Sequence, residues 1–244
     1  MIVFDEKIYA ENMIKKGFHT KNKNVYELHI LAKYYFYIGK EKEVVKDLLI
    51  KFCEKHIEYF NIDEWYGVIN RTISVANKGH LVTGKSVDIT KNELETIQQL
   101  EDIREQKLAF TMMVLYKFYD CKRFKVTIKD LFELSDVTTI NTDTKLKLLH
   151  SLTFKGLIDI DMRGRRWVKF SNENNKVEIK INNFEQFIYE YYLYTGFKDF
   201  TNCIICNKAI KKSINCIKKY CNKCSEEERR KRQKKYMQSR RKTC

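Results

Sequence analysis

The chain has 244 residues, of which 47 are Lys or Arg and 32 are Asp or Glu, so its formal net charge is +15. Hydrophobic residues make up 43% and aromatic residues 13% of the sequence, which is enough for a core and excludes global disorder. Proline is absent, which excludes collagen-like and proline-rich proteins. No apolar run approaches the ~20 residues that span a bilayer, and the first residues are too acidic for a secretory signal. We therefore expect a soluble cytoplasmic protein of one to three domains, with no membrane partner.

Apolar residues recur at helical spacing through the first third of the chain. This pattern predicts four helices, at residues 6–16, 24–38, 41–57 and 63–78. Gly79 follows the last of them and is expected to be its left-handed C-cap. We assign residues 1–85 to a helical N-terminal domain.

The middle of the chain combines helices with short strands. Thr90-Lys-Asn-Glu93 is a capping box that opens a helical segment running to about Leu115, with a break near Asp102. The pattern then predicts helices at 127–134 and 142–155, strands at 157–160, 166–170 and 177–181, and a closing helix at 184–194. Helices followed by a β-hairpin are typical of a winged helix-turn-helix, which we assign to residues 86–199. The expected fold class is mainly α, of the α+β type.

Two parts of the predicted winged helix carry candidate nucleic-acid contacts. A polar face of the helix at 142–155 could reach base edges or phosphates, with Leu146, Leu149 and Leu152 on the opposite, buried face. The arginines of the hairpin turn could reach the backbone or the minor groove. Many winged helices bind protein instead, and that alternative remains open. The candidate residues are Asn141, Thr144, Lys147 and Ser151 on the helix, and Arg163, Arg165 and Arg166 at the hairpin.

Five of the eight cysteines lie between residues 203 and 224. Two Cys-x2-Cys pairs separated by fourteen residues are close to the spacing of a four-thiolate zinc site. Such a site has no vacant position, so we expect structural Zn²⁺ in a zinc-ribbon-like module over residues 200–226. Disulfides are the weaker account for a cytoplasmic chain. The expected ligands are Cys203, Cys206, Cys221 and Cys224, with Cys216 as a possible substitute.

Positive charge is concentrated after this motif. Residues 200–244 contain 15 Lys and Arg but three acids, and so carry +12 of the net charge of +15. The acidic residues Glu226–Glu228 suit the first turn of a helix, and the Lys and Arg residues that follow suit its C-terminal end. The tail at 227–244 is expected to contact a polyanion, although a tail that only aids solubility is the alternative. Its candidate contacts are Arg229, Arg230, Arg232, Lys234, Lys235, Arg240 and Arg241.

The segment Gly79-His-Leu-Val-Thr-Gly84-Lys85-Ser86 matches the P-loop pattern of nucleotide hydrolases. The mechanism needs a buried strand before the first glycine and a helix that begins at the Lys-Ser pair. The preceding residues 63–78 have helical periodicity instead, and the next helix is capped only at Thr90. A helix cap followed by a turn is therefore the favoured interpretation.

Two resemblances bear on function. Residues 24–78, with Leu31-Ala32, Gly39 and Trp65, resemble a small helical module found at the C-terminal side of some phage and plasmid primases. That module, a winged helix and a terminal four-cysteine knuckle together resemble a group of uncharacterised phage and mobile-element proteins of Gram-positive bacteria. The resemblance implies a phage protein in the bacterial cytoplasm, and no primase catalytic core is present in the sequence.

The combined interpretation is a non-enzymatic, zinc-containing nucleic-acid-binding protein. It would bind DNA and assist replication or transcription of a phage or mobile element. One alternative is a phage interaction protein that inhibits a host or defence machine, with a host or phage protein as its partner. A small P-loop nucleotide hydrolase is the third possibility.

Overall fold

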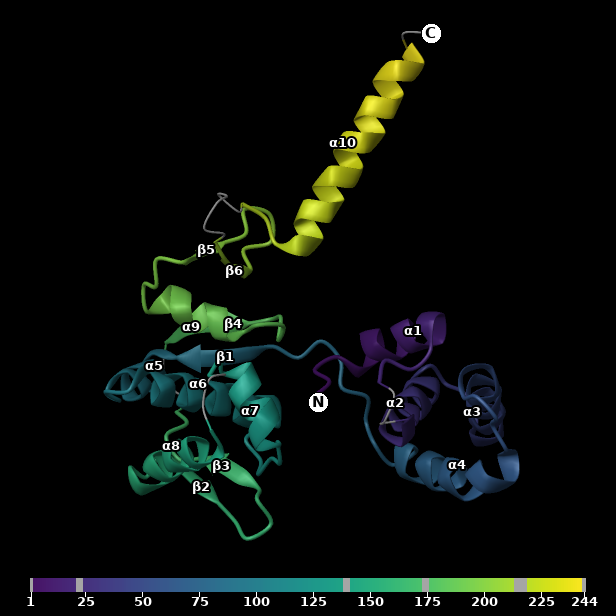
Figure 1. Ribbon diagram of the computed structural model, residues 1–244, viewed down its shortest axis with the longest axis horizontal. Helices are drawn as coiled ribbons and strands as arrows, with labels where there is room; N and C mark the ends of the chain where they lie inside the picture. The colour runs from purple at the N-terminus through teal and green to yellow at the C-terminus, as the bar shows by residue number, and fades with distance from the viewer. Residues whose placement is uncertain (1, 21–23, 138–140, 173–175, 213–218, 243–244) are drawn as a thin grey trace. The chain divides into compact units, whose positions relative to one another are not determined.

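The computed structural model describes residues 2–20, 24–137, 141–172, 176–212 and 219–242. Within these ranges the fold is mainly helical α+β, with ten helices and three two-stranded antiparallel sheets (Figure 1). Contacts divide the chain into two compact units, Met1–Lys85 and Ser86–Cys244. In the described part of the chain, no helix is long and apolar enough to cross a membrane.

The first unit is built from four helices around one apolar core. Buried residues from all four meet in this core, among them Met13, Leu31, Leu49 and Ile73. Val44 of the third helix is an exception among its apolar residues, because its side chain is exposed. The helices are α1 (Glu6–Lys16), α2 (Asn24–Tyr37), α3 (Lys42–His56) and α4 (Ile62–Ala76).

The segment after α4 is fastened to α1 through Glu6. The Glu6 N–H donates to the Val82 carbonyl and the Val82 N–H donates to the Glu6 carboxylate, both at 2.9 Å. The same carboxylate is paired with the Lys33 ammonium at 2.5 Å, and both side chains are buried. The expected left-handed cap at Gly79 is wrong: α4 is capped by Asn77 in a right-handed conformation, and Gly84, not Gly79, has a positive φ, +51°.

The second unit is organised around helix α6, which is buried on almost every side. It contacts the helices around it and two strands of the unit. The expected break near Asp102 is present, because the Asp102 carboxylate accepts from the Arg104 N–H at 2.8 Å and so caps α6. The elements around and including it are α5 (Lys91–Gln98), α6 (Ile103–Phe118), α7 (Ile128–Leu134), α8 (Thr142–Phe154), β2 (Ile158–Ile160), β3 (Arg166–Val168) and α9 (Ile188–Tyr194).

Strand β1 (Val87–Thr90) was not expected from the sequence. It pairs antiparallel with β4 (Val177–Ile181), with Val87 opposite Ile181 (Figure 1). Strands β2 and β3 form a separate hairpin, extended by a bridge between Phe124 and Arg166. The residues expected as a third consecutive strand therefore pair with the start of the domain, far earlier in the chain.

Helix α9 is shorter than the expected 184–194. The Asn183 carboxamide oxygen accepts from the Glu185 N–H at 2.8 Å, and Gln186 has a φ of +57°, so the chain turns before the helix begins. Two tyrosines then fix α9 to the core. The Tyr191 hydroxyl bonds Gln106 at 2.9 Å and the Tyr192 hydroxyl donates to Asp136 at 2.7 Å.

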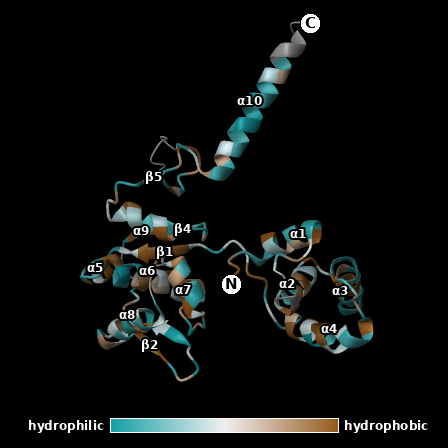
Figure 2. Ribbon diagram, viewed as in Figure 1, coloured by the Kyte–Doolittle hydropathy of each residue, from teal (hydrophilic) through white to brown (hydrophobic). Residues whose placement is uncertain are grey.

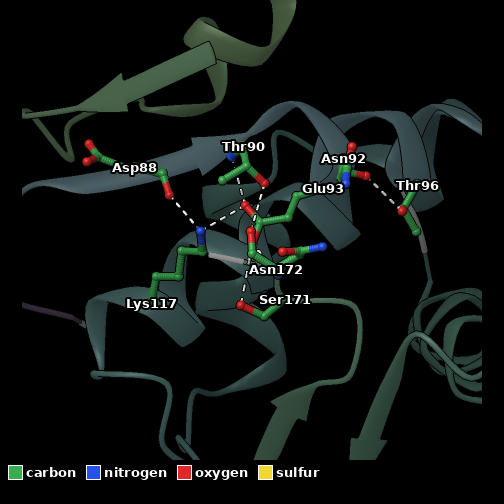
Figure 3. Close-up of polar contacts among 8 residues, drawn as sticks. All are labelled: Asp88, Thr90, Asn92, Glu93, Thr96, Lys117, Ser171 and Asn172. Atoms are coloured by element: carbon green, nitrogen blue, oxygen red, sulfur yellow. Dashed lines mark hydrogen bonds and ion pairs between the residues drawn. The ribbon is translucent and has the colours of Figure 1, made fainter. Parts of the chain in front are cut away.

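Glu93 is the polar centre of this unit (Figure 3). Its side chain is fully buried and accepts from the Thr90 N–H at 2.8 Å, which completes the predicted capping box. It also accepts from the Asn172 N–H at 2.9 Å and is paired with Lys117 at 2.8 Å. One carboxylate thus joins the end of β1, the loop before β4 and the last turns of α6.

We predict that Glu93→Ala lowers the free energy of unfolding of the second unit by about 3–5 kcal/mol, because it leaves the largely buried Lys117 ammonium without a carboxylate partner. The double change Glu93→Ala with Lys117→Met should cost less than the sum of the two single changes. Urea unfolding followed by Trp167 fluorescence in a Trp65→Phe background reports this unit alone.

The matched control for this measurement is Glu133→Ala, which breaks the exposed ion pair with Lys129. It should change stability little, because exposed pairs are weak. Equal losses for Glu93→Ala and Glu133→Ala would contradict the assigned role of Glu93.

Candidate metal centre and nucleic-acid surfaces

The first cysteine pair lies in the turn between β5 (Phe200–Asn202) and β6 (Ala209–Lys211). The Cys203 N–H donates to the Lys208 carbonyl at 2.8 Å, and the Asn207 N–H donates to the Cys203 carbonyl at 2.9 Å. Asn207 has a φ of +56°, in the left-handed region that asparagine tolerates better than most residues. These bonds close a tight knuckle that directs both sulfurs inward.

The second pair stands at the start of α10 (Asn222–Lys242). Cys221 directly precedes the helix and Cys224 lies in its first turn, where unbonded N–H groups and the helix dipole favour thiolates. The Cys224 N–H lies 3.5 Å from the Cys221 sulfur. The Ile204 N–H donates to the Lys219 carbonyl at 3.0 Å, which joins the two knuckles.

The four sulfurs form one cluster. All lie within 4.8 Å of one another, and those of Cys206 and Cys221 are 3.7 Å apart. A tetrahedral zinc ion with Zn–S bonds of ~2.3 Å requires sulfurs about 3.8 Å apart, whereas a disulfide requires ~2 Å. The donor set and spacing fit a metal ion such as zinc.

The pKa values of the clustered thiols also differ from one another. Burial would raise the pKa of Cys203, but backbone hydrogen bonds, first among them that of Cys206, outweigh it and hold the pKa at about 6. Burial and the neighbouring thiols raise the pKa of Cys224. Four adjacent thiolates repel one another, and a bound cation removes that repulsion.

The cysteine module is attached to the rest of its unit through α9. The Ala209 N–H donates to the Glu190 carboxylate at 3.2 Å, and Lys208 pairs with Glu185 at 3.2 Å. Phe200 packs on the Tyr192 ring with centroids 4.6 Å apart. The position of the cysteine module relative to α9 is therefore set by both polar and aromatic contacts.

Two further cysteines in the described part of the chain, Cys53 and Cys121, fall outside this cluster. Cys53 is buried in the core of the first unit, and burial raises its thiol pKa to about 12. Cys216, the possible substitute ligand, lies outside the described residues.

Helix α8 exposes only part of the expected polar face. Lys147 is exposed, while Thr144 and Ser151 are half-buried. The Asn141 carboxamide oxygen caps the helix by accepting from the Thr144 N–H at 2.9 Å. Leu146, expected in the core, is 43% exposed, and Leu148 is buried instead.

The hairpin supplies a smaller basic surface than expected. Arg163 is exposed, and Arg165 is paired with Asp161 at 2.6 Å. The prediction that Arg166 contacts nucleic acid at the surface is wrong, because this residue is 6% exposed. Its guanidinium donates to the Val126 carbonyl at 2.6 Å, and burial lowers its pKa.

Arg123 was missed from the sequence. The bridge between Phe124 and Arg166 carries it to the hairpin, where its guanidinium lies 4.3 Å from the Trp167 ring centroid. The two adjacent basic residues Lys122 and Arg123 were the available sequence signal for this contact, but their position at the hairpin depends on that bridge.

Helix α10 is hydrophilic along almost its whole length (Figure 2). Two of its cations are paired with acids of its first turns, Arg230 with Glu226 at 2.8 Å and Lys231 with Glu228 at 2.9 Å. The side chains of Arg240 and Arg241 lie outside the described residues. The predicted contacts that are exposed on the helix are Arg229, Arg230, Arg232, Lys234 and Lys235.

The P-loop match does not have P-loop structure. Residues 79–86 run from the end of helix α4 to strand β1, which is the reverse of the required strand–loop–helix order. The Val82 N–H already donates to the Glu6 carboxylate, whose charge would repel a phosphate. The segment is a connection that is fixed to the first unit.

Comparison with known proteins identified no relatives. No protein-family model matches the chain, and neither the curated proteins nor the solved structures gave a match.

We predict one zinc ion per chain, bound by Cys203, Cys206, Cys221 and Cys224. Elemental analysis should show that Cys221→Ser loses zinc, whereas Cys216→Ser retains it. Equal zinc loss in both variants would overturn the assignment of the fourth ligand.

We also predict that Lys85→Ala leaves folding and nucleic-acid binding nearly unchanged, because its loop lacks the phosphate-binding arrangement. Circular dichroism and a nucleotide-binding titration are the measurements. Saturable ATP binding by the unmodified protein that disappears in Lys85→Ala would contradict this interpretation.

Proposed function

We propose that this chain is a zinc-containing nucleic-acid-binding protein without catalytic activity, acting as an accessory factor in the replication or transcription of a phage or mobile element. The main support is α10, which exposes a run of cations directly after the cysteine cluster. Cations on an exposed helix suit phosphate contact, which supplies affinity without sequence preference.

The cysteine cluster would hold the first turn of this basic helix in place. With zinc bound, residues 200–226 form a zinc-ribbon-like module that has too little apolar core to be stable alone. The metal would hold Cys221 and Cys224, and with them the first turn of α10, against the β5–β6 knuckle. The cations of α10 would then extend from a structured base.

A winged helix formed by α6, α7, α8 and the β2–β3 hairpin would provide the second contact. Its exposed cations are Lys147 on α8, Arg163 at the hairpin turn and, in place of Arg166, Arg123 on the Trp167 ring. Duplex DNA suits a helix in the major groove and a basic hairpin beside it. The first unit would then be the primase-C-terminal-like domain.

A second candidate function is inhibition of a host or defence machine by protein contact. It is favoured by apolar side chains exposed on α8 and the hairpin turn: Phe154 is 95% exposed and Leu146 and Met162 are also exposed. A pull-down from host lysate with and without nuclease separates the two. A stoichiometric protein partner that survives nuclease treatment would favour inhibition.

Removing residues 225–244, which contain nine Lys and Arg, should weaken binding to all duplexes alike. With about half of these cations on phosphate, at about −0.9 per contact, the slope of log affinity against log salt should flatten by about 3–5 units. Fluorescence anisotropy at several salt concentrations measures this slope.

A second variant keeps the helix, because truncation next to Cys224 could disturb the metal site. Changing Arg229, Arg230, Arg232, Lys234 and Lys235 to Gln should flatten the slope by about 2–4 units. Changing Glu226, Glu227 and Glu228 to Gln is the control, and it should not flatten the slope. An unchanged slope in the five-fold variant would remove the main support for the proposal.

A further inference from the structure

A cleft of about 780 Å³ opens beside the cysteine cluster. One wall is the cysteine module, from Ile205 to Lys211 and from Cys221 to Glu227, and the other is the turn before α9, residues 183–186. Its volume lies within the ~300–1,000 Å³ of clefts that hold small ligands. The Lys208–Glu185 ion pair joins the two walls, and the Ala209–Glu190 hydrogen bond joins the cysteine module to α9.

The lining combines apolar, cationic and amide groups, and it also contains the carboxylates of Glu185 and Glu227 and the thiols of Cys206, Cys221 and Cys224. Ile205, Ala209 and Ile210 provide apolar surface, and Ile205 is 50% exposed although it lies between two of the cysteines. Lys211 and Lys223 bring exposed cations. Amide side chains, such as that of Gln186 on the opposite wall, are hydrogen-bond donors and acceptors.

We propose that this cleft binds an unpaired nucleotide, with its base on Ile205 and its phosphates near Lys211 and Lys223. A base in a duplex is stacked on both faces and paired along one edge. Only a single-stranded or flipped nucleotide can therefore enter a cleft of this kind. Flipped bases are held between aromatic or apolar side chains, and cations along a groove follow the backbone of a single strand. The cleft therefore gives the protein a preference for unpaired nucleic acid.

The position of α10 supports this ligand. Asn222, Lys223 and Glu227 of α10 line the cleft, and the next exposed cation along the same helix is Arg229. A strand whose phosphates follow these cations would reach the cleft at the start of the helix. The inference rests on the proposed function, since it assigns a substrate class to the same basic surface.

Neighbouring residues provide a matched pair of variants. Ile204 and Ile205 are adjacent between Cys203 and Cys206 and are 69% and 50% exposed, but of the two only Ile205 lines the cleft. Ile205→Ser should remove the base contact and Ile204→Ser should not. Lys223→Ala and Lys219→Ala form a second pair of equal charge change, because Lys219 lies outside the cleft lining.

The experiment is fluorescence anisotropy on the full chain with three labelled probes: a thymidine 12-mer, a uridine 12-mer and a 12-mer of abasic sites with the same phosphates. Zinc content is measured for every variant.

The unmodified protein should bind a base-bearing 12-mer more tightly than the abasic one. Ile205→Ser should weaken that binding roughly fivefold, as expected for losing partial burial of one isoleucine, and should leave the abasic probe unaffected. The thymidine and uridine arms distinguish DNA from RNA as the source of the strand.

Two results would overturn the inference while leaving the proposed function intact. One is equal affinity for base-bearing and abasic probes. The other is an equal effect of Ile204→Ser and Ile205→Ser in variants with full zinc content. Absence of binding to every probe and to duplex DNA would instead contradict the proposed function itself.

Discussion

Four cysteine sulfurs held within 4.8 Å cannot all ionise unless a cation balances them, and the end of this chain is arranged around that constraint. The two knuckles share few apolar contacts: the buried cluster here consists of three of the cysteines and Ile210, with Tyr220 packed against it. A metal ion would replace the missing core. The start of α10 and one wall of the cleft depend on the same four sulfurs, so the proposed binding surfaces would depend on the metal.

The second unit has a different kind of constraint at its centre. Glu93 is buried with a full set of partners, and those partners come from sequence positions as distant as Thr90 and Ser171–Asn172 (Figure 3). A buried carboxylate is costly unless every partner is in place, so it favours one arrangement of these segments. That arrangement sets β4 and the turn at residues 183–186, which forms the second wall of the cleft.

The features that the sequence predicted are local ones. Helices such as α3 and α4 follow from 3.6-residue periodicity, and the Glu93 capping box needs only four residues. The cysteine cluster follows from spacing alone, because a Cys-x2-Cys knuckle is closed by its own backbone. Each of these depends on residues that are close in sequence.

The features that were missed depend on distant partners. Strand β1 has four residues and is specified by its pairing with β4, which a linear pattern does not contain. Arg166 is buried because the bridge to Phe124 brings it against Val126, and the loop after Gly79 is held by Glu6, which lies far earlier in the chain. The cleft could not be expected either, since its second wall comes from the turn before α9.

The central claim is that nucleic acid is bound at the cysteine module and α10, and photo-cross-linking with peptide mapping tests it most directly. A single-stranded 12-mer that carries a photoreactive base would be irradiated with the zinc-loaded protein, and the cross-linked peptides identified by mass spectrometry. The account predicts cross-links within residues 200–242, lost when zinc is removed by a chelator. Cross-links confined to residues 1–85, or a pattern unchanged by zinc removal, would contradict it.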